Sequence, residues 1–341
     1  MRKPTIVDIA DALGITPSTV SRALAGSSNV KASTRKTVEA KARELGYERN
    51  DLASNFRRGV TRTVGIIVPR INREFFSSII SAAESVFVEA GYSVVICQTH
   101  EKLENEIRAL KTLAGGRVAG IMISHSAETV NGSDIEETLG GKIKLVQFDR
   151  VFRGLPGSIV VNDDFEGARA ATLHLIRNGY KRIGALVGYM DTEAFVRRYE
   201  GYKAALAESS IPLDESIVYK NTIVRENGFE NAAKAIGAGC DALYSSGDYS
   251  ALGALECAFS QGLSVPGDFG IVGTANEKFT SMISPAMSSV DQHSMEMGAQ
   301  AAKEMLRLLG GAKSGKEIVV GTSLVIRQSS AGKRVRGSSR S

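Results

Sequence analysis

The sequence is poor in the residues that build disulfide frameworks, metal centres and many active sites. It contains no tryptophan, three cysteines and four histidines among 341 residues. Cys97, Cys240 and Cys257 are far apart and outside any C-x-x-C spacing, so neither a disulfide framework nor a zinc site is indicated. The histidines are scattered without metal-ligand spacing, and no G-x-S-x-G motif is present. These absences argue against a metal centre and against a serine hydrolase.

Long apolar runs and nucleotide-binding loops are also missing. The sequence has no apolar run long enough to span a membrane, and its start, MRKPTIVDIA, lacks the apolar core of a signal peptide, which predicts a cytoplasmic protein without a membrane partner. No G-x-G-x-x-G follows a predicted strand. The run GGAKSGKE from Gly310 resembles a phosphate loop, but it follows a predicted helix and has Glu317 where Ser or Thr is required. We therefore expect no enzyme activity, no cofactor and no metal.

Basic charge is concentrated at the two ends of the chain. The whole chain carries a formal net charge of +5, whereas residues 1–62 carry +6 and residues 333–341 carry +4, which leaves about −5 for the middle. A basic head suits contacts with DNA phosphates, and an acidic body is repelled by the same polyanion. The basic tail, residues 330–341, is interpreted as a flexible end, with a second nucleic-acid contact as the alternative.

The segment TIVDIADALGITPSTVSR, residues 5–22, predicts two short helices joined by a tight turn. Apolar residues recur at helical spacing up to Leu13, and Gly14 suits the left-handed end of a helix. Thr16 is a favourable N-cap, and Pro17 suits the first position of the second helix. Short polar side chains and one arginine then occupy its early turns, as in a helix that reads DNA. Ordinary core residues and ordinary caps are the alternative for this pair of helices alone.

A third helix is expected from near Ser33 to Gly46, with Val38, Ala42 and Leu45 on its inner face. The head then carries several motifs in one order: T-x-x-D-I-A from residue 5, T-V-S-R at 19–22, T-R-x-x-V from residue 34, E-L-G-Y-x-x-N at 44–50, and Ala53 with an apolar residue at 56. This run resembles the DNA-binding domain and hinge of LacI/GalR-family transcription regulators.

The resemblance implies a helix-turn-helix DNA-binding domain over residues 1–49 and a hinge over residues 50–62. It implies base-edge contacts from Ser18 and Arg22 and an apolar contact from Pro17. Neighbouring polar residues are expected to hold phosphates or flank the recognition helix: Thr5, Thr16, Thr19, Ser21, Asn29 and Thr34. Two heads of a homodimer would then bind half-sites of a near-palindromic double-stranded operator, about one helical turn apart.

The hinge around Ala53 can form one or two turns of helix, which are marginal in water without a surface to pack on. By resemblance, two such helices enter the minor groove and insert an apolar side chain between base pairs. Phe56 occupies that place and is a competent wedge for kinking the duplex, and Arg57 and Arg58 would lie against phosphates. An unstructured linker whose Phe56 packs on the body is the alternative.

From Thr63 onward, apolar runs alternate with amphipathic segments, which predicts an α/β sensor built from two doubly wound parallel-sheet subdomains. The strand candidates are TVGIIVP, YSVVICQ, RVAGIMIS and IKLVQFD in the first half, and KRIGALVG, SIVYK, DALYSS and FGIVG in the second. Two such halves resemble the periplasmic-binding-protein-like sensor of the same family over residues 63–329. The chain is then expected to cross between the halves near 161–163, 288–292 and 321–324.

A ligand cleft is expected between the halves, at the carboxyl ends of the strands. The candidate effector-binding residues follow strands or occupy matching motifs: Phe75, Phe76, Asp149, Arg150, Arg198, Asp248 and Asn276. Asn72 and Arg73, in the loop before Phe75, are expected to line the cleft beside them. Arginine and carboxylate offer paired donors and acceptors, and an aromatic ring covers an apolar face, which favours a sugar or sugar derivative. In the alternative, Asp149 and Arg150 pair with each other, Asp248 caps a helix, and the phenylalanines belong to the core.

Two departures from the family pattern leave the identity of the ligand open. Glu74 stands where many members carry proline, and Thr274-Ala275 replaces the more usual aromatic-acidic pair after Gly273. We predict a sequence-specific DNA-binding transcription regulator, a repressor, that is controlled by a small-molecule effector. The alternative is a sugar-binding protein of the same sensor fold without operator-specific regulation.

Overall fold

The computed structural model describes residues 4–24, 29–47, 61–141 and 143–332. The chain divides into two compact units, Met1–Thr61 and Arg62–Ser341, which we call the head and the sensor. The expected hinge residues Ala53, Phe56 and Arg57 lie outside the described residues. Within the described part of the chain, no helix is long and apolar enough to cross a membrane.

The head consists of three helices around a small apolar core. They are α1 (Ile6–Leu13), α2 (Pro17–Leu24) and α3 (Ala32–Glu44). Thr5 and Asp8 form a capping box at the start of α1, and Gly14 ends it with a φ of 60°. The fully or nearly fully buried side chains are Ile9, Ala10, Val20, Ala23, Val38 and Ala42. The predicted helix-turn-helix and the third helix are confirmed.

Leu45 departs from the prediction that it lies on the inner face of the third helix. That prediction is wrong, because α3 ends at Glu44 and Leu45 is 37% exposed. Gly46 follows with a φ of 63°, and the Tyr47 N–H donates to the Ala42 carbonyl at 2.8 Å. This left-handed turn brings Tyr47 against the core in place of Leu45.

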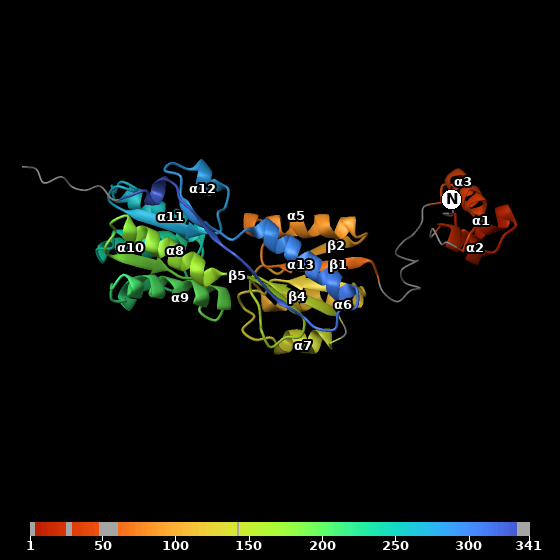
Figure 1. The fold of residues 1–341 in the computed structure, drawn as a ribbon, viewed down its shortest axis with the longest axis horizontal. Coiled ribbons are helices and arrows are strands. Elements are labelled where there is room, and N and C mark those ends of the chain that lie inside the picture. Colours follow the sequence, from red (N-terminus) through yellow and green to blue (C-terminus); the bar gives the residue numbers. More distant parts are fainter. Residues whose placement is uncertain (1–3, 25–28, 48–60, 142, 333–341) are drawn as a thin grey trace, which may run out of the picture. The chain divides into compact units, whose positions relative to one another are not determined.

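The first subdomain of the sensor is a six-stranded parallel sheet with helices on both faces (Figure 1). Its strands, in spatial order, are β11 (Glu317–Val320), β5 (Ser158–Asn162), β4 (Lys144–Phe148), β3 (Gly120–Ile123), β1 (Thr63–Val68) and β2 (Ser93–Gln98). Its helices are α5 (Glu74–Glu89), α6 (Leu103–Gly115), α7 (Ser133–Leu139) and α13 (Ser294–Leu309). Helices α5 and α13 pack together over one face, and α6 and α7 cover the other.

The second subdomain repeats this plan with one reversed edge strand. Its strands, in spatial order, are β12 (Ser323–Val325), β10 (Ser288–Asp291), β9 (Gly270–Thr274), β8 (Ala242–Ser245), β6 (Ile183–Leu186) and β7 (Val218–Tyr219). Its helices are α8 (Asp164–Arg177), α9 (Glu193–Glu208), α10 (Arg225–Gly237), α11 (Asp248–Ser260) and α12 (Phe279–Met282), with short 3₁₀ turns η1 (Glu215–Ile217) and η2 (Gln328–Ser330). Strand β12 runs antiparallel to β10. The predicted α/β fold class is confirmed.

The two subdomains are joined by three chain crossings. Strand β5 of the first sheet leads into α8 of the second subdomain, β10 leads back into α13, and β11 is followed by β12. The Asn162 side-chain amide donates to the Gln292 carbonyl at 2.7 Å, and the Gln292 amide donates to Asn162 Oδ1 at 3.0 Å. These buried bonds tie two of the crossings together beside the space between the subdomains.

Candidate functional site

Helix α2 of the head presents a polar surface that runs from its first turn to Arg22 in its last turn. Pro17, Ser18 and Arg22 are exposed there. The Arg22 Nε donates to the Ser18 carbonyl at 3.2 Å, and its Nη2 lies 3.4 Å from Ser18 Oγ. Arginine and serine therefore form one continuous surface along the helix, and the planar guanidinium keeps further donors for a partner. This is the arrangement by which a recognition helix meets base edges in the major groove.

The other predicted head residues hold or border this surface. Thr16 caps α2, because its hydroxyl accepts from the Thr19 N–H at 3.3 Å and bonds the Thr19 hydroxyl at 2.9 Å. The Thr5 hydroxyl donates to the Asp8 carboxylate at 2.7 Å, so it works in the α1 cap. Ser21 and Thr34 are half-buried, and Asn29 is exposed.

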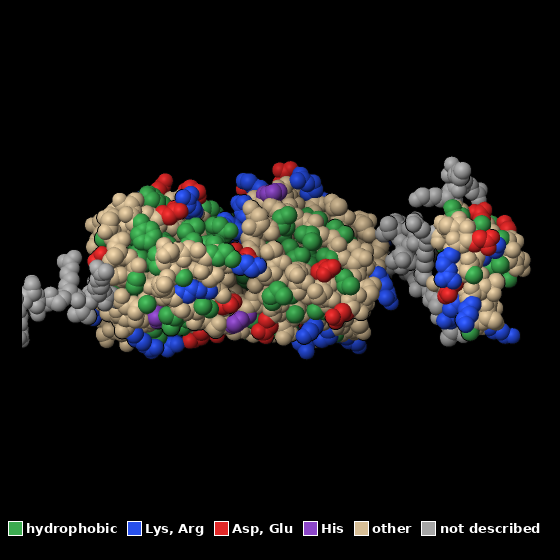
Figure 2. All heavy atoms as spheres, turned by 90° about the horizontal axis from the view of Figure 1, so that it is seen from above, with side chains coloured by type: hydrophobic (Ala, Val, Ile, Leu, Met, Phe, Trp, Pro, Cys, Tyr) green, Lys and Arg blue, Asp and Glu red, His purple; other side chains and the backbone are tan. Residues whose placement is uncertain are grey.

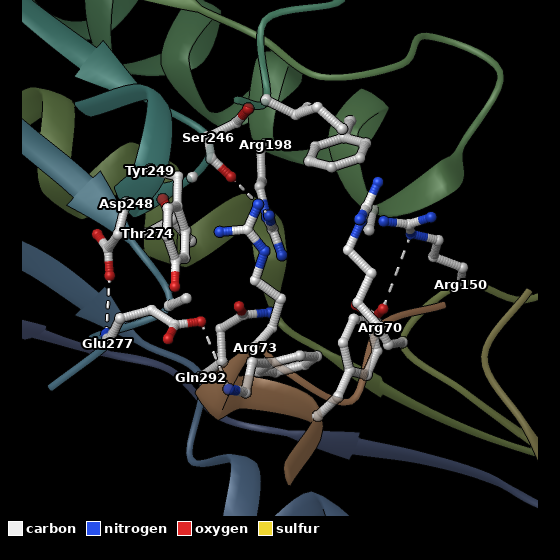
Figure 3. A pocket seen from close by; sticks show the side chains of 18 of the residues that line it. Arg70, Arg73, Arg150, Arg198, Ser246, Asp248, Tyr249, Thr274, Glu277 and Gln292 are labelled. Carbon is white, nitrogen blue, oxygen red and sulfur yellow. Dashed lines mark hydrogen bonds and ion pairs between the residues drawn. The ribbon is translucent and has the colours of Figure 1, made fainter. Parts of the chain in front are cut away.

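A cavity of about 120 Å³ lies between the two subdomains of the sensor (Figure 3). Both subdomains contribute to its wall. The first supplies residues that follow β1, β2 and β4, and the second supplies residues from α9 and from the segments after β8 and β9. The wall combines arginines, carboxylates and aromatic rings. Carboxyl ends of parallel strands are where ligand crevices open in doubly wound sheets.

On the first side of the cavity, Arg150 pairs with Glu101. Their closest contact is 2.6 Å from Nη1 to Oε2, whereas Arg150 and Asp149 are 4.0 Å apart. Asp149 instead accepts a hydrogen bond from the Ser124 hydroxyl at 3.0 Å, and burial raises the pKa of its carboxyl. Phe75 and Phe76 lie in the first turn of α5. Both rings are buried in the core and also line the cavity, so their place in the core does not exclude them from the wall of the ligand site.

On the second side, Arg198 is fixed by two partners. Its Nε donates to Asp164 Oδ1 at 2.7 Å and its Nη1 to the Ser246 carbonyl at 2.8 Å. Both side chains of the ion pair are 7% exposed. Burial raises the pKa of Asp164 to about 6, against the opposing effect of the guanidinium. Arg198 thus reaches the cavity as a pre-oriented cation.

Asp248 begins α11 but does not cap it. Its carboxylate accepts from the Ser289 hydroxyl at 2.7 Å and from the Glu277 N–H at 2.8 Å. Burial raises its pKa to about 7. Gly273 makes this position possible, because a Cβ there would lie 2.1 Å from Asp248 Oδ1.

Two side chains bridge the mouth of the cavity from one subdomain to the other. The Glu277 carboxylate accepts from the Glu74 N–H at 3.0 Å, so a residue after β9 occupies the N-terminal end of α5. In return, the Glu74 carboxylate accepts from the Lys278 N–H at 2.6 Å and pairs with Lys278 Nζ at 2.9 Å. The subdomains are therefore linked by contacts that a widening of the cavity would break.

The structure brings six of the seven predicted effector residues to one cavity. These are Phe75, Phe76, Asp149, Arg150, Arg198 and Asp248. Asn276 does not line it, because its amide donates to Asp291 at 3.0 Å and accepts from Arg327 at 2.7 Å. Its neighbours Ala275 and Glu277 line the wall instead.

Sequence reasoning did not select several residues of the wall. They include Arg70, Glu101, Phe195, Tyr249, Glu277 and Gln292. Arg70 follows β1 in the loop that leads to α5, and Tyr249 follows Asp248, so adjacency to selected residues was the available signal. Arg73, which was expected at the cleft from its place before Phe75, lines the cavity, whereas Asn72 does not. Glu101 follows β2, and nothing in its local sequence distinguishes it.

Comparison with known proteins gives consistent matches to both units. The description "Bacterial regulatory proteins, lacI family" matches residues 5–50, and "Periplasmic binding protein-like domain" matches residues 172–330. The chain is 29% identical over 332 residues to the HTH-type transcriptional regulator DegA of Bacillus subtilis (strain 168), covering 96% of this chain and 98% of that protein. It is 29% identical over 304 residues to the HTH-type transcriptional repressor PurR of Actinobacillus pleuropneumoniae serotype 3 (strain JL03), covering 89% and 90%. Among solved structures, a complex of the transcriptional regulator CelR with cellobiose is similar with a TM-score of 0.72 and 27% identity, over 96% of this chain and 99% of that chain.

Proposed function

Because the chain belongs to the LacI family and is a ligand-regulated, DNA-binding transcription regulator rather than an enzyme, we propose that it is a repressor whose effector is a sugar or sugar derivative. The observation that carries this proposal is the cavity between the subdomains, in which arginines, carboxylates and aromatic rings converge. A protein with this role meets its operator on the chromosome, so we place it in the cytoplasm.

Recognition of the operator base sequence is assigned to the exposed face of α2. Ser18 and Arg22 are positioned together on that face, and Pro17 adds an apolar contact at its first turn. Arginine suits guanine, whose O6 and N7 accept two parallel hydrogen bonds in the major groove. Thr5, Thr16, Thr19, Ser21, Asn29 and Thr34 are proposed to support this face or to bind phosphates. In the hinge, Ala53, Phe56 and Arg57 are proposed to contact the minor groove, with Phe56 as the wedge.

Replacing Arg22 with alanine should weaken specific operator binding by about 1–3 kcal/mol, because a bidentate base contact is lost. The preference at one base pair of each half-site should relax, while binding to unrelated DNA changes little. Fluorescence anisotropy with an operator fragment, identified by selection from genomic DNA, and with its single-base variants measures both effects. Arg43→Ala is the matched control, since Arg43 is an exposed arginine in the last turn of α3. Equal losses on operator and unrelated DNA would contradict base reading by Arg22 and indicate a phosphate contact.

Effector control is proposed to act through the separation of the two subdomains. The Glu74–Lys278 and Glu277–α5 contacts hold the cavity mouth in one arrangement. The subdomains can adopt one arrangement with these contacts formed and another with them broken. A ligand that binds one arrangement more tightly than the other increases the population of that arrangement. The first subdomain continues directly into the hinge, so its displacement alters the hinge and thereby the spacing of two heads.

A homodimer is proposed because apolar side chains are exposed on both subdomains. Val88 of α5 is 56% exposed, and Val95 and Ile96 of the edge strand β2 are 44% and 48% exposed. On the second subdomain, Phe259 is 44% and Met282 is 75% exposed. Figure 2 shows apolar side chains gathered over both subdomains on the face that it presents. Surfaces of this kind commonly mark protein interfaces, and a twofold dimer predicts a near-palindromic operator.

The proposal is tested by selecting genomic DNA fragments with the purified full-length protein, in the absence and presence of a panel of sugars. We expect enrichment of one near-palindromic sequence, with release or gain in the presence of one class of sugar. A sequence without twofold symmetry would contradict the dimer. No sequence preference under any condition, with sugar binding retained, would contradict regulation and favour the sugar-binding alternative.

A further inference from the structure

Four arginine side chains line the cavity of the sensor, and they come from both subdomains. Arg70, Arg73 and Arg150 belong to the first subdomain, and Arg198 to the second. Figure 3 shows their guanidinium groups directed into the space between the subdomains. Arginine stays protonated in proteins and offers five N–H donors with no acceptor. The wall is therefore rich in fixed positive charge and in donors.

Two of these arginines make a close ion pair with a carboxylate of the protein, and the other two do not. Arg150 and Arg198 each have a close carboxylate partner, at 2.6 Å and 2.7 Å. Arg70 is 3.9 Å from Glu101, which it shares with Arg150. Arg73 has no ion pair with any carboxylate of the described residues, and neither its guanidinium nor that of Arg70 makes a hydrogen bond to a described residue.

Arg73 is nevertheless held in place. Its guanidinium carbon lies 3.3 Å from the centre of the Tyr249 ring, which is a stacked cation–π contact between the first and second subdomains. Stacking occupies the flat face of the guanidinium and leaves the N–H groups at its edge. A planar fork fixed in this way matches a carboxylate or a phosphate with little further loss of freedom.

The carboxylates of the wall already accept hydrogen bonds from donors of the protein. Asp248 and Glu277 use oxygens on donors of the protein itself, namely Ser289, the Glu277 N–H and the N–H groups at the start of α5. Burial raises the pKa of Asp248 to about 7, which weakens its negative charge near neutral pH, and burial also raises the pKa of Asp149 and of Glu277. Arg73 lowers the pKa of Glu277 against the effect of burial, so these two charges interact, but the N–H donors of Arg73 have no acceptor among the described residues and can bind an anion.

We propose that the effector carries an acidic group, a carboxylate or a phosphate, which binds at Arg73 and Arg70. This inference rests on the proposed sugar-responsive function and narrows its ligand class. Phe75 and Phe195 cover the apolar face of the ring, and the other arginines meet its oxygens. The cavity volume of about 120 Å³ corresponds to roughly ten water molecules at about 10–15 Å³ each. That space suits one acidic sugar unit better than a longer chain.

The test is isothermal titration of the full-length protein with matched probes that differ in charge. Glucose and galactose are the neutral probes, glucuronate, galacturonate and gluconate carry carboxylates, and glucose 6-phosphate carries a phosphate. We expect at least one acidic probe to bind about 10- to 100-fold more tightly than its neutral counterpart, as charge-assisted hydrogen bonds predict. Comparison of the carboxylate probes with the phosphate probe identifies which acidic group the cavity prefers.

Two variants connect this preference to Arg73. Arg73→Gln should remove about a tenfold or larger part of the acid affinity and leave neutral probes unchanged. Arg73→Lys, which keeps the charge but not the planar fork, should retain part of it. Arg197→Gln is the control, because Arg197 is exposed and lies outside this cavity. It should bind every probe as the unaltered protein does.

The outcomes separate this inference from the proposed function. Neutral and acidic probes of equal affinity, or an equal loss for both in Arg73→Gln, would overturn the acidic-group inference while sugar control of the operator stands. Operator release by a nucleobase and by no sugar would overturn both. Acid-selective binding lost in Arg73→Gln, together with acid-dependent change in operator binding, supports both.

Discussion

Replacing Arg198 with methionine should lower the free energy of unfolding of the sensor by about 3–5 kcal/mol and reduce effector affinity about 100-fold. The variant keeps an unbranched apolar stem but leaves the Asp164 carboxylate buried without its cation, and such a loss is among the costliest single changes. The Ser246 carbonyl loses its donor as well. Urea unfolding followed by tyrosine fluorescence measures the stability, since eight of nine tyrosines lie beyond residue 62 and no tryptophan is present.

The pH dependence of this deficit has a definite sign. Burial raises the pKa of Asp164 to about 6 while Arg198 opposes the rise, so removal of Arg198 raises that pKa further. A carboxyl whose folded pKa exceeds its unfolded value of 3.8 binds more protons in the folded state, and stability is lost as pH rises through the folded pKa. The variant should therefore recover part of its stability when pH falls from 7.5 to about 5.

Two controls separate the ion pair from the ligand contact. Arg197→Met changes the neighbouring exposed arginine and should alter neither stability nor effector binding. The double variant Arg198→Met/Asp164→Asn removes the buried charge, so it should regain stability without regaining effector affinity. Full effector affinity in the double variant would refute a role for Arg198 at the ligand.

Replacing Ile9 with alanine should abolish most operator binding, with a loss of about 10- to 100-fold, while effector binding stays intact. Ile9 is fully buried in the small apolar core of the head, which among the described residues has six fully or nearly fully buried side chains. Such a truncation costs about 2–5 kcal/mol, and a head of about sixty residues has little stability in reserve. Anisotropy with labelled operator measures the first effect, and titration with the effector measures the second.

Val7→Ala is the matched control for the head. Val7 lies in the same helix and is 50% exposed, so its truncation leaves no cavity. It should bind operator within about twofold of the unaltered protein, since surface changes cost within about 0.5 kcal/mol. If Ile9→Ala binds as tightly as Val7→Ala, operator recognition does not depend on the packed core of the three helices.

The fold was accessible from the sequence because its signals are local. Buried parallel strands appear as short apolar runs such as TVGIIVP, which contains β1 (Thr63–Val68). Leu45 was misplaced because the left-handed turn at Gly46 substitutes Tyr47 in the core. A helical period alone does not reveal where the last turn stops.

The cavity was only partly accessible, because its wall is assembled from segments far apart in the chain. Arg150 and Asp149 are neighbours in sequence, yet Arg150 pairs with Glu101, which follows a different strand. Asn276 occupies a position that matches the family pattern, but its amide bonds Asp291 and Arg327, and it does not line the cavity. Side-chain direction after a strand depends on such long-range partners, which no local pattern encodes.

The first subdomain is assembled from distant parts of the chain, and this has a consequence for biosynthesis. Its core includes Met297, Met305 and Val320 of α13 and β11, which pack with α5 and the early strands. During translation, residues 63–162 emerge long before these partners, so α5 leaves the ribosome with its apolar face uncovered. The head, whose core needs only residues near the N-terminus, can fold first. In a nascent chain, the DNA-binding head can therefore fold before the effector-binding sensor is complete.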